Sequence, residues 1–335
     1  GKMVLDEEAL ENVKKIFARF NRPMLESNYN QAMVPDGCTV IQNSRGTAPG
    51  MWFEKEGRIF VSMPGVPHEM KGMMTDFVIP RLSKYFTMPF ILSRTLLTAG
   101  IGESFLSEMV KDVEQVLPEN IKMAYLPNYG MVRLRLTGIS ADKELLEESL
   151  DEHFSKLKAC VKDYLVTDED QSIQQVVAGM LKRIKKTLAT AESCTGGYIA
   201  HLLTAESGAS EYFKGGIVSY SDEMKNHLLG VPLSVIKEAG AVSEAVVQMM
   251  VSGMMEQGNA DYALAVSGVM GPGGGTEEKP VGTVWIAVGN RKTVKAQKFN
   301  FRYDRSRNIE MTANSALNML RRFIQDESFG EMRIV

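Results

Sequence analysis

The feature that most constrains the fold of this 335-residue chain is an apolar segment that runs into a glycine-containing turn and then into a helical pattern. Residues 187–190 are typical of a strand, residues 191–197 read Ala-Glu-Ser-Cys-Thr-Gly-Gly, and residues 198–203 are typical of a helix. Such a turn lifts a small side chain above a sheet edge and surrounds it with unused backbone N–H groups. The pattern predicts an α/β fold with Ser193 as a candidate nucleophile, although an ordinary tight turn would explain the turn alone.

Residues 168–335 show the clearest alternation of strand and helix patterns. We expect helices at 172–186, 196–205, 222–229, 243–257 and 306–325, and strands at 187–192, 215–220, 261–267, 281–289 and 293–301. The third strand is nearly all apolar in 261–266, as expected for a strand covered on both faces. Alternation followed by a run of strands predicts a three-layer α/β/α domain with a mixed sheet.

Two further segments precede this domain. Residues 89–167 follow the order strand, helix, strand, strand, helix, strand of a ferredoxin-like module, in which Arg133 and Arg135 form either a basic stripe or an ordinary solvated strand face. Residues 1–88 contain a helix with Asp6 at its start, a hairpin of short strands and a second helix. These elements are few for an independent domain, so we expect a partial α/β domain that belongs to a larger one.

Composition excludes several classes of protein. The net charge of −3 gives no electrostatic case for nucleic acid or an anionic membrane, and no apolar run is long enough to span a bilayer. Three widely spaced cysteines and four scattered histidines form neither a disulfide framework nor a zinc site. We therefore expect a cytoplasmic protein without a structural metal.

Candidate chemistry falls at expected strand ends and loops, where the active sites of open α/β sheets gather. The groups are Ser193 with Cys194 and Thr195, Ser210, Tyr220 with residues 221–225, and the glycine-rich segment 267–275. The glycine-rich segment can present N–H groups to an anion, although a plain connector is an equal alternative. It is neither a P-loop nor a dinucleotide fingerprint, because no Lys-Ser/Thr pair follows it and a strand begins where a helix should start.

Lys225 is the candidate partner of Ser193, because it lies about one turn into the helix that follows Tyr220. A Ser/Lys pair can hydrolyse an amide when the lysine is desolvated and neutral. A solvated lysine is the simpler interpretation, and Cys194 is a rival nucleophile unless it is buried and inert. Arg305, at the start of the last helix, is suited to a phosphate or is a surface arginine.

Together these motifs resemble a known family. Similarity to the C-terminal domain of the competence/damage-inducible protein CinA extends over residues 192–197, 219–225, 240–244, 267–274 and 279–284. Residues 43–50 and 64–70 resemble the later half of the family's N-terminal domain, which is similar to molybdopterin-binding folds. The family usually has glycine before the Asp-Arg pair, where this chain has Tyr303.

The resemblance implies a nicotinamide mononucleotide deamidase, an amidohydrolase of NAD salvage that needs no cofactor and releases nicotinic acid mononucleotide and ammonia. It implies that Ser193 and Lys225 form a catalytic dyad, with Ser210 and Tyr220 as further active-site hydroxyls. Substrate contacts are expected from Thr195, Gly196, Gly197, Gly268, Gly271, Gly273, Gly274 and Arg305. We expect a small pyridine nucleotide as partner, no membrane, no direct nucleic acid contact and a homodimer.

Two alternatives stay open. The family's N-terminal domain is linked to ADP-ribose pyrophosphatase activity with a divalent metal, for which Glu54, Glu56 and Glu69 are the nearby candidate ligands. The family's early Gly-Asp-Glu and Thr-Gly-Gly motifs are absent from this chain, which argues against that activity here. The other alternative is a non-enzymatic scaffold or nucleotide sensor in DNA uptake or repair.

Overall fold

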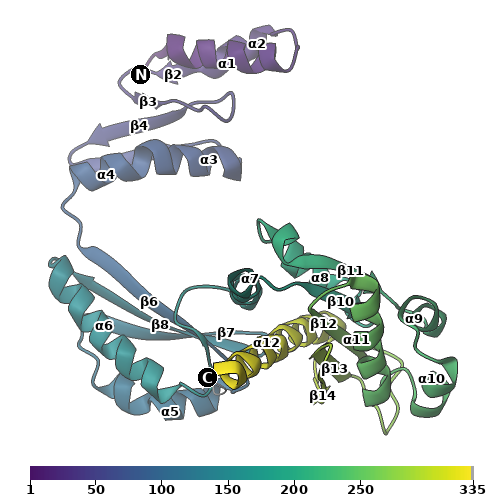
Figure 1. Cartoon of the computed structure of the whole chain (residues 1–335). Coiled ribbons are helices and arrows are strands. Elements are labelled where there is room, and N and C mark those ends of the chain that lie inside the picture. Colours follow the sequence, from purple (N-terminus) through teal and green to yellow (C-terminus); the bar gives the residue numbers. More distant parts are fainter. Residues whose placement is uncertain (333–335) are drawn as a thin grey trace. The chain divides into compact units, whose positions relative to one another are not determined.

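The computed structural model describes residues 1–332, with the side chains of residues 1–326. The chain forms two compact units, Gly1–Pro89 and Phe90–Val335, each built from helices and strands (Figure 1). The predicted mixed α/β class is confirmed. The last three residues of the predicted domain 168–335 lie outside the described residues.

The first unit has a small core. Its elements are β1 (Met3–Leu5), α1 (Glu7–Arg19), α2 (Glu26–Tyr29), β2 (Met33–Pro35), β3 (Thr39–Ile41), β4 (Gly50–Lys55), β5 (Arg58–Ser62), α3 (Pro67–Met73) and α4 (Ile79–Tyr85). Strands β1 and β2 pair, and β3, β4 and β5 form a separate antiparallel sheet. The core consists of Ile41, Trp52, Met73 and Val78. The single helix expected over residues 68–85 is interrupted by a π-helical turn at Met74–Val78.

Removal of the N-cap of α1 is expected to destabilise this unit. The carboxylate of Asp6 accepts a hydrogen bond from the N–H of Ala9 at 2.7 Å, which satisfies one donor of the first helical turn. Asp6→Ala should therefore lower the free energy of unfolding by about 1 kcal/mol. The measurement is urea unfolding followed by the fluorescence of buried Trp52 in a Trp285→Phe background, because the chain has two tryptophans. An unchanged midpoint would show that the cap contributes nothing.

The second unit begins with the predicted ferredoxin-like module. Its elements are β6 (Phe90–Ala99), α5 (Glu103–Gln115), β7 (Ile121–Asn128), β8 (Met131–Ser140), α6 (Lys143–Cys160) and β9 (Leu165–Thr167). The sheet order is β7-β8-β6-β9 and all pairs are antiparallel. Arg133 and Arg135 are both paired with Asp170, at 3.4 and 3.0 Å, which favours the alternative of an ordinary strand face over a basic stripe.

The rest of the unit is a three-layer α/β/α sandwich, as predicted (Figure 1). Its elements are α7 (Ile173–Ile184), β10 (Leu188–Glu192), α8 (Tyr198–Thr204), β11 (Phe213–Val218), α9 (Asp222–Leu229), α10 (Leu233–Ala239), α11 (Glu244–Gly258), β12 (Tyr262–Gly268), β13 (Thr283–Asn290), β14 (Val294–Asn300) and α12 (Arg305–Met332). The sheet order is β11-β10-β12-β13-β14. β10 runs parallel to β11 and β12, while β13 and β14 are antiparallel additions.

Two apolar cores hold the layers together. Helices α7, α8 and α12 pack on one face of the sheet, and α9, α10 and α11 pack on the other. The first core also contains Leu97, Met131 and Val166 of the ferredoxin-like module. This shared core explains why residues 90 onward form one compact unit. None of the helices in the described part of the chain is both long enough and apolar enough to cross a membrane.

Candidate active site

A pocket of about 210 Å³ opens at the edge of the sheet where β10, β11 and β12 end. Because the three strands are parallel, their carboxyl ends meet at this edge, which is where open α/β sheets bind ligands. The lining residues come from these strand ends, from α9, from the segment before α11 and from the start of α12. They are Ser193, Cys194, Tyr220, Asp222, Lys225, Ala241, Val242, Ser267, Gly268, Met270 and Arg305.

Ser193 is held at the end of β10. It is the first residue after the strand and is 7% exposed. Its N–H donates to the carbonyl of Val266 on β12 at 3.1 Å, and the N–H of Ser219 donates to the Glu192 carbonyl at 2.8 Å. The backbone beside the serine is therefore tied to both neighbouring strands, which fixes the position from which the hydroxyl faces the pocket.

The carboxylate of Glu192 is buried beneath the turn that follows Ser193. It is 1% exposed and accepts hydrogen bonds from the Thr195 hydroxyl at 2.6 Å and from the N–H groups of Gly197, Ile199 and Ala200 at 3.1, 3.0 and 2.8 Å. Glu192 was not among the predicted site residues. An acidic residue at the end of an otherwise apolar strand was the available signal, because a buried carboxylate needs several donors around it.

These contacts decide which N–H groups of the turn are free. The N–H of Gly196 donates to the Ser193 carbonyl at 3.2 Å and that of Gly197 donates to Glu192. Within the described residues, the N–H groups of Cys194 and Thr195 donate no hydrogen bond to another residue. Of these two residues, Cys194 lines the pocket with Ser193, whereas Thr195 lines a separate hollow.

Lys225 lies on α9 and is almost fully buried, with 1% exposure. Its Nζ donates to the carbonyl oxygens of Tyr220 and Ser221 at 3.2 and 3.5 Å, and lies 3.9 Å from the Asp222 carboxylate. Burial lowers the pKa of the Lys225 ammonium, and the charge of Asp222 opposes that shift. The net effect makes the uncharged amine easier to form than in a solvated lysine.

Ser193 and Lys225 both line the same pocket. Within residues 1–326, no hydrogen bond joins the Ser193 hydroxyl to the Lys225 amine. Proton transfer therefore requires a rotation of the serine side chain or one bridging water, and a pocket of about 210 Å³ has room for either. Catalytic hydrogen bonds are often long in the absence of substrate.

Cys194 is unsuited to the role of nucleophile. Its side chain is buried, and this burial raises the pKa of the thiol to about 12. The reactive thiolate is therefore scarce at neutral pH. Of the two neighbouring candidates, Ser193 has the better environment for attack.

Arg305, at the start of α12, also lines the pocket. Its Nη1 donates to the Gly271 carbonyl at 2.8 Å and its Nη2 donates to the Tyr220 hydroxyl at 3.2 Å. A guanidinium has five N–H donors, so these two contacts orient the group and leave others for an anion. The structure thus brings Ser193, Lys225, Tyr220 and Arg305 together.

Other predicted site residues lie elsewhere. Ser210 is exposed in a 3₁₀ turn just before β11, at the strand end that pairs with Leu188, so within one chain it lies at the opposite sheet edge from Ser193. Thr195, Gly196 and Gly197 line a separate hollow beside α8 and α12. Gly268 lines the candidate pocket and Gly271 contacts Arg305, whereas Gly273 and Gly274 are exposed on the glycine-rich loop.

Asn308 fixes the segment in which this chain departs from the family pattern. It is fully buried on α12 and donates to the carbonyl oxygens of Met270 and Tyr303, at 3.1 and 2.9 Å. The Tyr303 side chain is 50% exposed and lines a hollow next to the ferredoxin-like module. Tyr303 does not line the pocket that contains Ser193.

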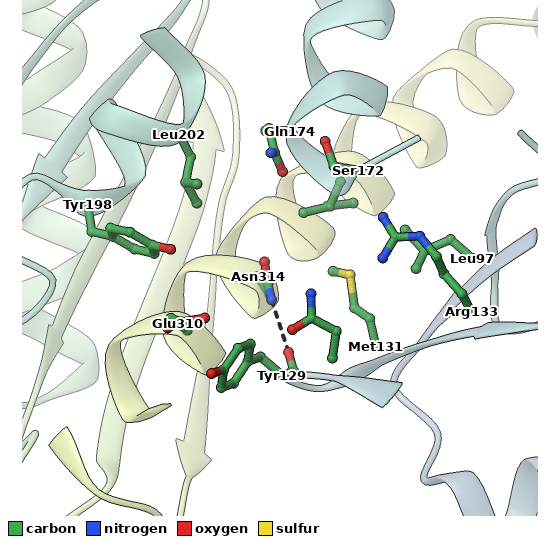
Figure 2. Close-up of a pocket in the computed structure, with 12 residues that line it drawn as sticks. Leu97, Tyr129, Met131, Arg133, Ser172, Gln174, Tyr198, Leu202, Glu310 and Asn314 are labelled. Atoms are coloured by element: carbon green, nitrogen blue, oxygen red, sulfur yellow. Dashed lines mark hydrogen bonds between the residues drawn. The ribbon is translucent and has the colours of Figure 1, made fainter. Parts of the chain in front are cut away.

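A further pocket lies between the ferredoxin-like module and the sandwich (Figure 2). Side chains from β8, α7, α8 and α12 line it, including Arg133, Tyr198 and Glu310. The Asn314 side-chain amide donates to the Tyr129 carbonyl at 3.1 Å across it. Neither Ser193 nor Lys225 lines this pocket.

The acidic residues proposed as metal ligands in the first unit do not converge. Glu54 accepts a hydrogen bond from the Trp52 indole at 2.7 Å, and Glu69 accepts one from the Asn43 amide at 2.7 Å. Among the described residues, no three His, Cys, Asp or Glu side chains come together in a way that could hold a metal ion. The pyrophosphatase alternative thus gains no metal site from these carboxylates.

The fold and the pocket define an α/β protein whose sheet edge carries a serine and a buried lysine. The chain belongs to the CinA family: residues 170–324 match the model of the CinA C-terminal domain and residues 93–167 that of the damage-inducible protein CinA KH domain. A CinA-like protein from Cytophaga hutchinsonii is 40% identical over 324 residues, which are 97% of this chain and 78% of that protein.

A putative competence-damage inducible protein from Caldicellulosiruptor bescii has the same identity and coverage, 40%, 97% and 78%. Among solved structures, a CinA superfamily protein from Klebsiella pneumoniae is 34% identical, with a TM-score of 0.45, over 47% of this chain and 99% of that one.

Proposed function

We propose that this protein hydrolyses the carboxamide of nicotinamide mononucleotide to nicotinic acid mononucleotide and ammonia, with Ser193 as nucleophile and Lys225 as general base. The observation that carries the proposal is the buried amine of Lys225 in the pocket that Ser193 faces. Burial lowers the pKa of this amine, which is what a lysine needs in order to accept a serine proton.

In the first step the Ser193 oxygen bonds to the carboxamide carbon, its proton passes to Lys225, and the carbonyl electron pair moves to the oxygen. The free N–H groups of Cys194 and Thr195 are suited to stabilise that oxyanion. The C–N bond then breaks, and Lys225 returns the proton to the departing ammonia. Water adds to the resulting ester, again giving a proton to Lys225, and that proton returns to the Ser193 oxygen as the carboxylic acid product leaves.

The hydrogen bonds of Lys225 suit a neutral amine. Such an amine has two N–H donors and one lone pair, whereas an ammonium has three donors and no acceptor. The carbonyl oxygens of Tyr220 and Ser221 can take the two donors. The lone pair is then left for the proton of Ser193.

Arg305 is the group best suited to the 5′-phosphate. Its guanidinium is exposed, lines the same pocket, and is oriented by Gly271 and Tyr220. Arginine binds phosphate with two parallel hydrogen bonds, so the group can anchor one end of the nucleotide while the carboxamide lies at Ser193.

The direct test is product analysis with the wild-type chain. Nicotinamide mononucleotide is incubated with the protein in the presence of a metal chelator, and nicotinic acid mononucleotide and ammonia are quantified together. We expect equal amounts of both products. Absence of both products, or release of free nicotinamide instead of ammonia, would contradict the proposal.

The activity should rise with pH as Lys225 loses its proton, with a midpoint below the ordinary lysine pKa of 10.5, because burial lowers the pKa of this group. Asp222→Asn removes the nearest negative charge, which raises the pKa of Lys225 in the wild type. The rising limb of kcat/KM against pH should therefore move to lower pH in this variant. Glu238→Gln on α10, an exposed residue outside the pocket, serves as the control. If the rising part of the kcat/KM profile of Asp222→Asn stays in place or moves to higher pH, this would argue against Lys225 as the base.

A further inference from the structure

We infer that Glu192 is a positioning residue for the reaction, whose buried carboxylate holds the turn after Ser193 in the shape that presents the serine hydroxyl to the substrate and leaves the N–H groups of Cys194 and Thr195 without partners in other residues. This inference rests on the proposed function. The carboxylate lies inside the turn and does not line the pocket with Ser193 and Lys225. It therefore acts through its neighbours and not on the substrate.

The Glu192 carboxylate accepts four hydrogen bonds from the residues that follow it. One carboxylate oxygen of Glu192 accepts from the Thr195 hydroxyl and from the N–H groups of Gly197 and Ile199, and the other accepts from the N–H of Ala200. The four donors span the turn and the first residues of α8. A single side chain thus connects the end of β10 to the start of the following helix.

The contacts of Glu192 also determine which backbone N–H groups of the turn stay free. Because Glu192 takes the N–H of Gly197, and the Ser193 carbonyl takes that of Gly196, the free pair is confined to Cys194 and Thr195, directly after the nucleophile. Gly197 has a φ of 96°, a conformation that glycine adopts without strain. If the carboxylate were lost, the turn could relax and the free pair would no longer have a fixed direction.

An amide cannot replace this carboxylate without a conflict. In Glu192→Gln the side-chain oxygen can take the site with three donors, but the NH₂ group then faces the N–H of Ala200, donor against donor. The reverse orientation places the NH₂ group against three donors. The variant keeps the size of the side chain and changes only the hydrogen-bonding groups that face the turn.

The experiment compares Glu192→Gln with the wild type on nicotinamide mononucleotide. We expect kcat to fall by about 10–100-fold, as a small displacement of reacting groups does, while KM changes little because the substrate anchors are untouched. Thr195→Val, which removes one donor to Glu192, should show the same pattern in milder form, and Thr195→Ser should restore the activity because it keeps the hydroxyl.

A matched control separates positioning from general stability. Thr98 is fully buried in the same compact unit, and its hydroxyl donates to the Val132 carbonyl at 2.9 Å, away from the pocket. Thr98→Val should lower the melting temperature and leave kcat unchanged. A Glu192→Gln variant that loses stability but keeps the wild-type kcat, as Thr98→Val should, would overturn the inference.

Amide hydrogen exchange gives a readout that does not depend on the substrate. In Glu192→Gln, or in Thr195→Val if the first variant does not fold, exchange at Gly197, Ile199 and Ala200 should become faster, while amides of the ferredoxin-like module stay protected. Unchanged exchange in the turn would overturn the inference about Glu192. A wild-type chain that releases no ammonia would count against the proposed function instead, so the two failures are distinguishable.

Discussion

Lys225→Met is expected to lower kcat/KM for ammonia release from nicotinamide mononucleotide by about 10²–10⁴-fold, the contribution of a general base. Methionine has nearly the length of lysine and suits a site that is 1% exposed, so the variant should fold. It retains no group that can accept the Ser193 proton. The measurement is steady-state kinetics of ammonia release at several pH values, where the variant should also lose the pH-dependent rise.

The controls for this variant use other basic side chains. Lys237→Met on α10 removes an exposed lysine near the site in sequence and should keep the wild-type rate. Lys225→Arg keeps a positive charge but cannot supply a neutral base, so it should be as inactive as Lys225→Met. Near wild-type turnover in Lys225→Met would remove Lys225 from the mechanism.

The same substitution has a predictable effect on stability. Burial lowers the pKa of Lys225 in the folded protein, so at pH values between that pKa and 10.5 the unfolded chain binds more protons than the folded one. The stability of the wild type should therefore rise with pH across this window, and fall as pH drops through it. Thermal unfolding of Lys225→Met should lack this contribution.

Ser193→Ala is expected to have the larger effect, a loss of kcat on the order of 10⁶-fold, as is seen when a hydrolase loses its nucleophile. The side chain is nearly buried and its N–H contact to Val266 is made by the backbone, so alanine preserves the fold. Residues that act as one unit are not additive, so Ser193→Ala/Lys225→Met should be no slower than Ser193→Ala alone. Discontinuous ammonia assays over long incubations would measure these residual rates.

Cys194→Ala distinguishes the two candidate nucleophiles. Burial raises the pKa of this thiol to about 12, so we expect the variant to keep most of the wild-type turnover. Its backbone N–H, one of the two free donors beside Ser193, is still present in alanine. Loss of activity in Cys194→Ala combined with activity in Ser193→Ala would reverse the assignment of the nucleophile.

Much of this fold could be predicted because helix caps, turns and apolar patterns in the sequence agree with the helices and strands of the structure. The helix expected at 222–229 coincides with α9, since Ser221 caps its start and Gly230 adopts a left-handed conformation at its end. The short helix α10 was not predicted, because its seven residues bury only Ile236 and carry little periodic signal. The succession of strands and helices along residues 89–167 predicted a ferredoxin-like module. The order of the strands within its sheet, β7-β8-β6-β9, confirms this prediction.

Part of the candidate site could also be predicted, because two of its residues follow strands that the sequence pattern indicates. Ser193 and Tyr220 each follow a parallel strand, and the carboxyl ends of such strands share one edge. Ser210 precedes its strand, so the direction of β11 puts it at the other edge within one chain. Glu192 was missed because its four partners are supplied by the folded turn, which a one-dimensional pattern does not contain.

The apolar core that joins the two parts of the second unit has a consequence for where the chain can be divided. A fragment starting at residue 168 would lose Leu97, Met131 and Val166, and their apolar neighbours on α7 and α12 would be exposed to water. At about 25 cal/mol for each Å² of uncovered apolar surface, such a cut favours self-association of the fragment. A truncated version designed for expression should therefore keep Phe90 and everything that follows it, even though the pocket that contains Ser193 and Lys225 is built entirely from residues after 190.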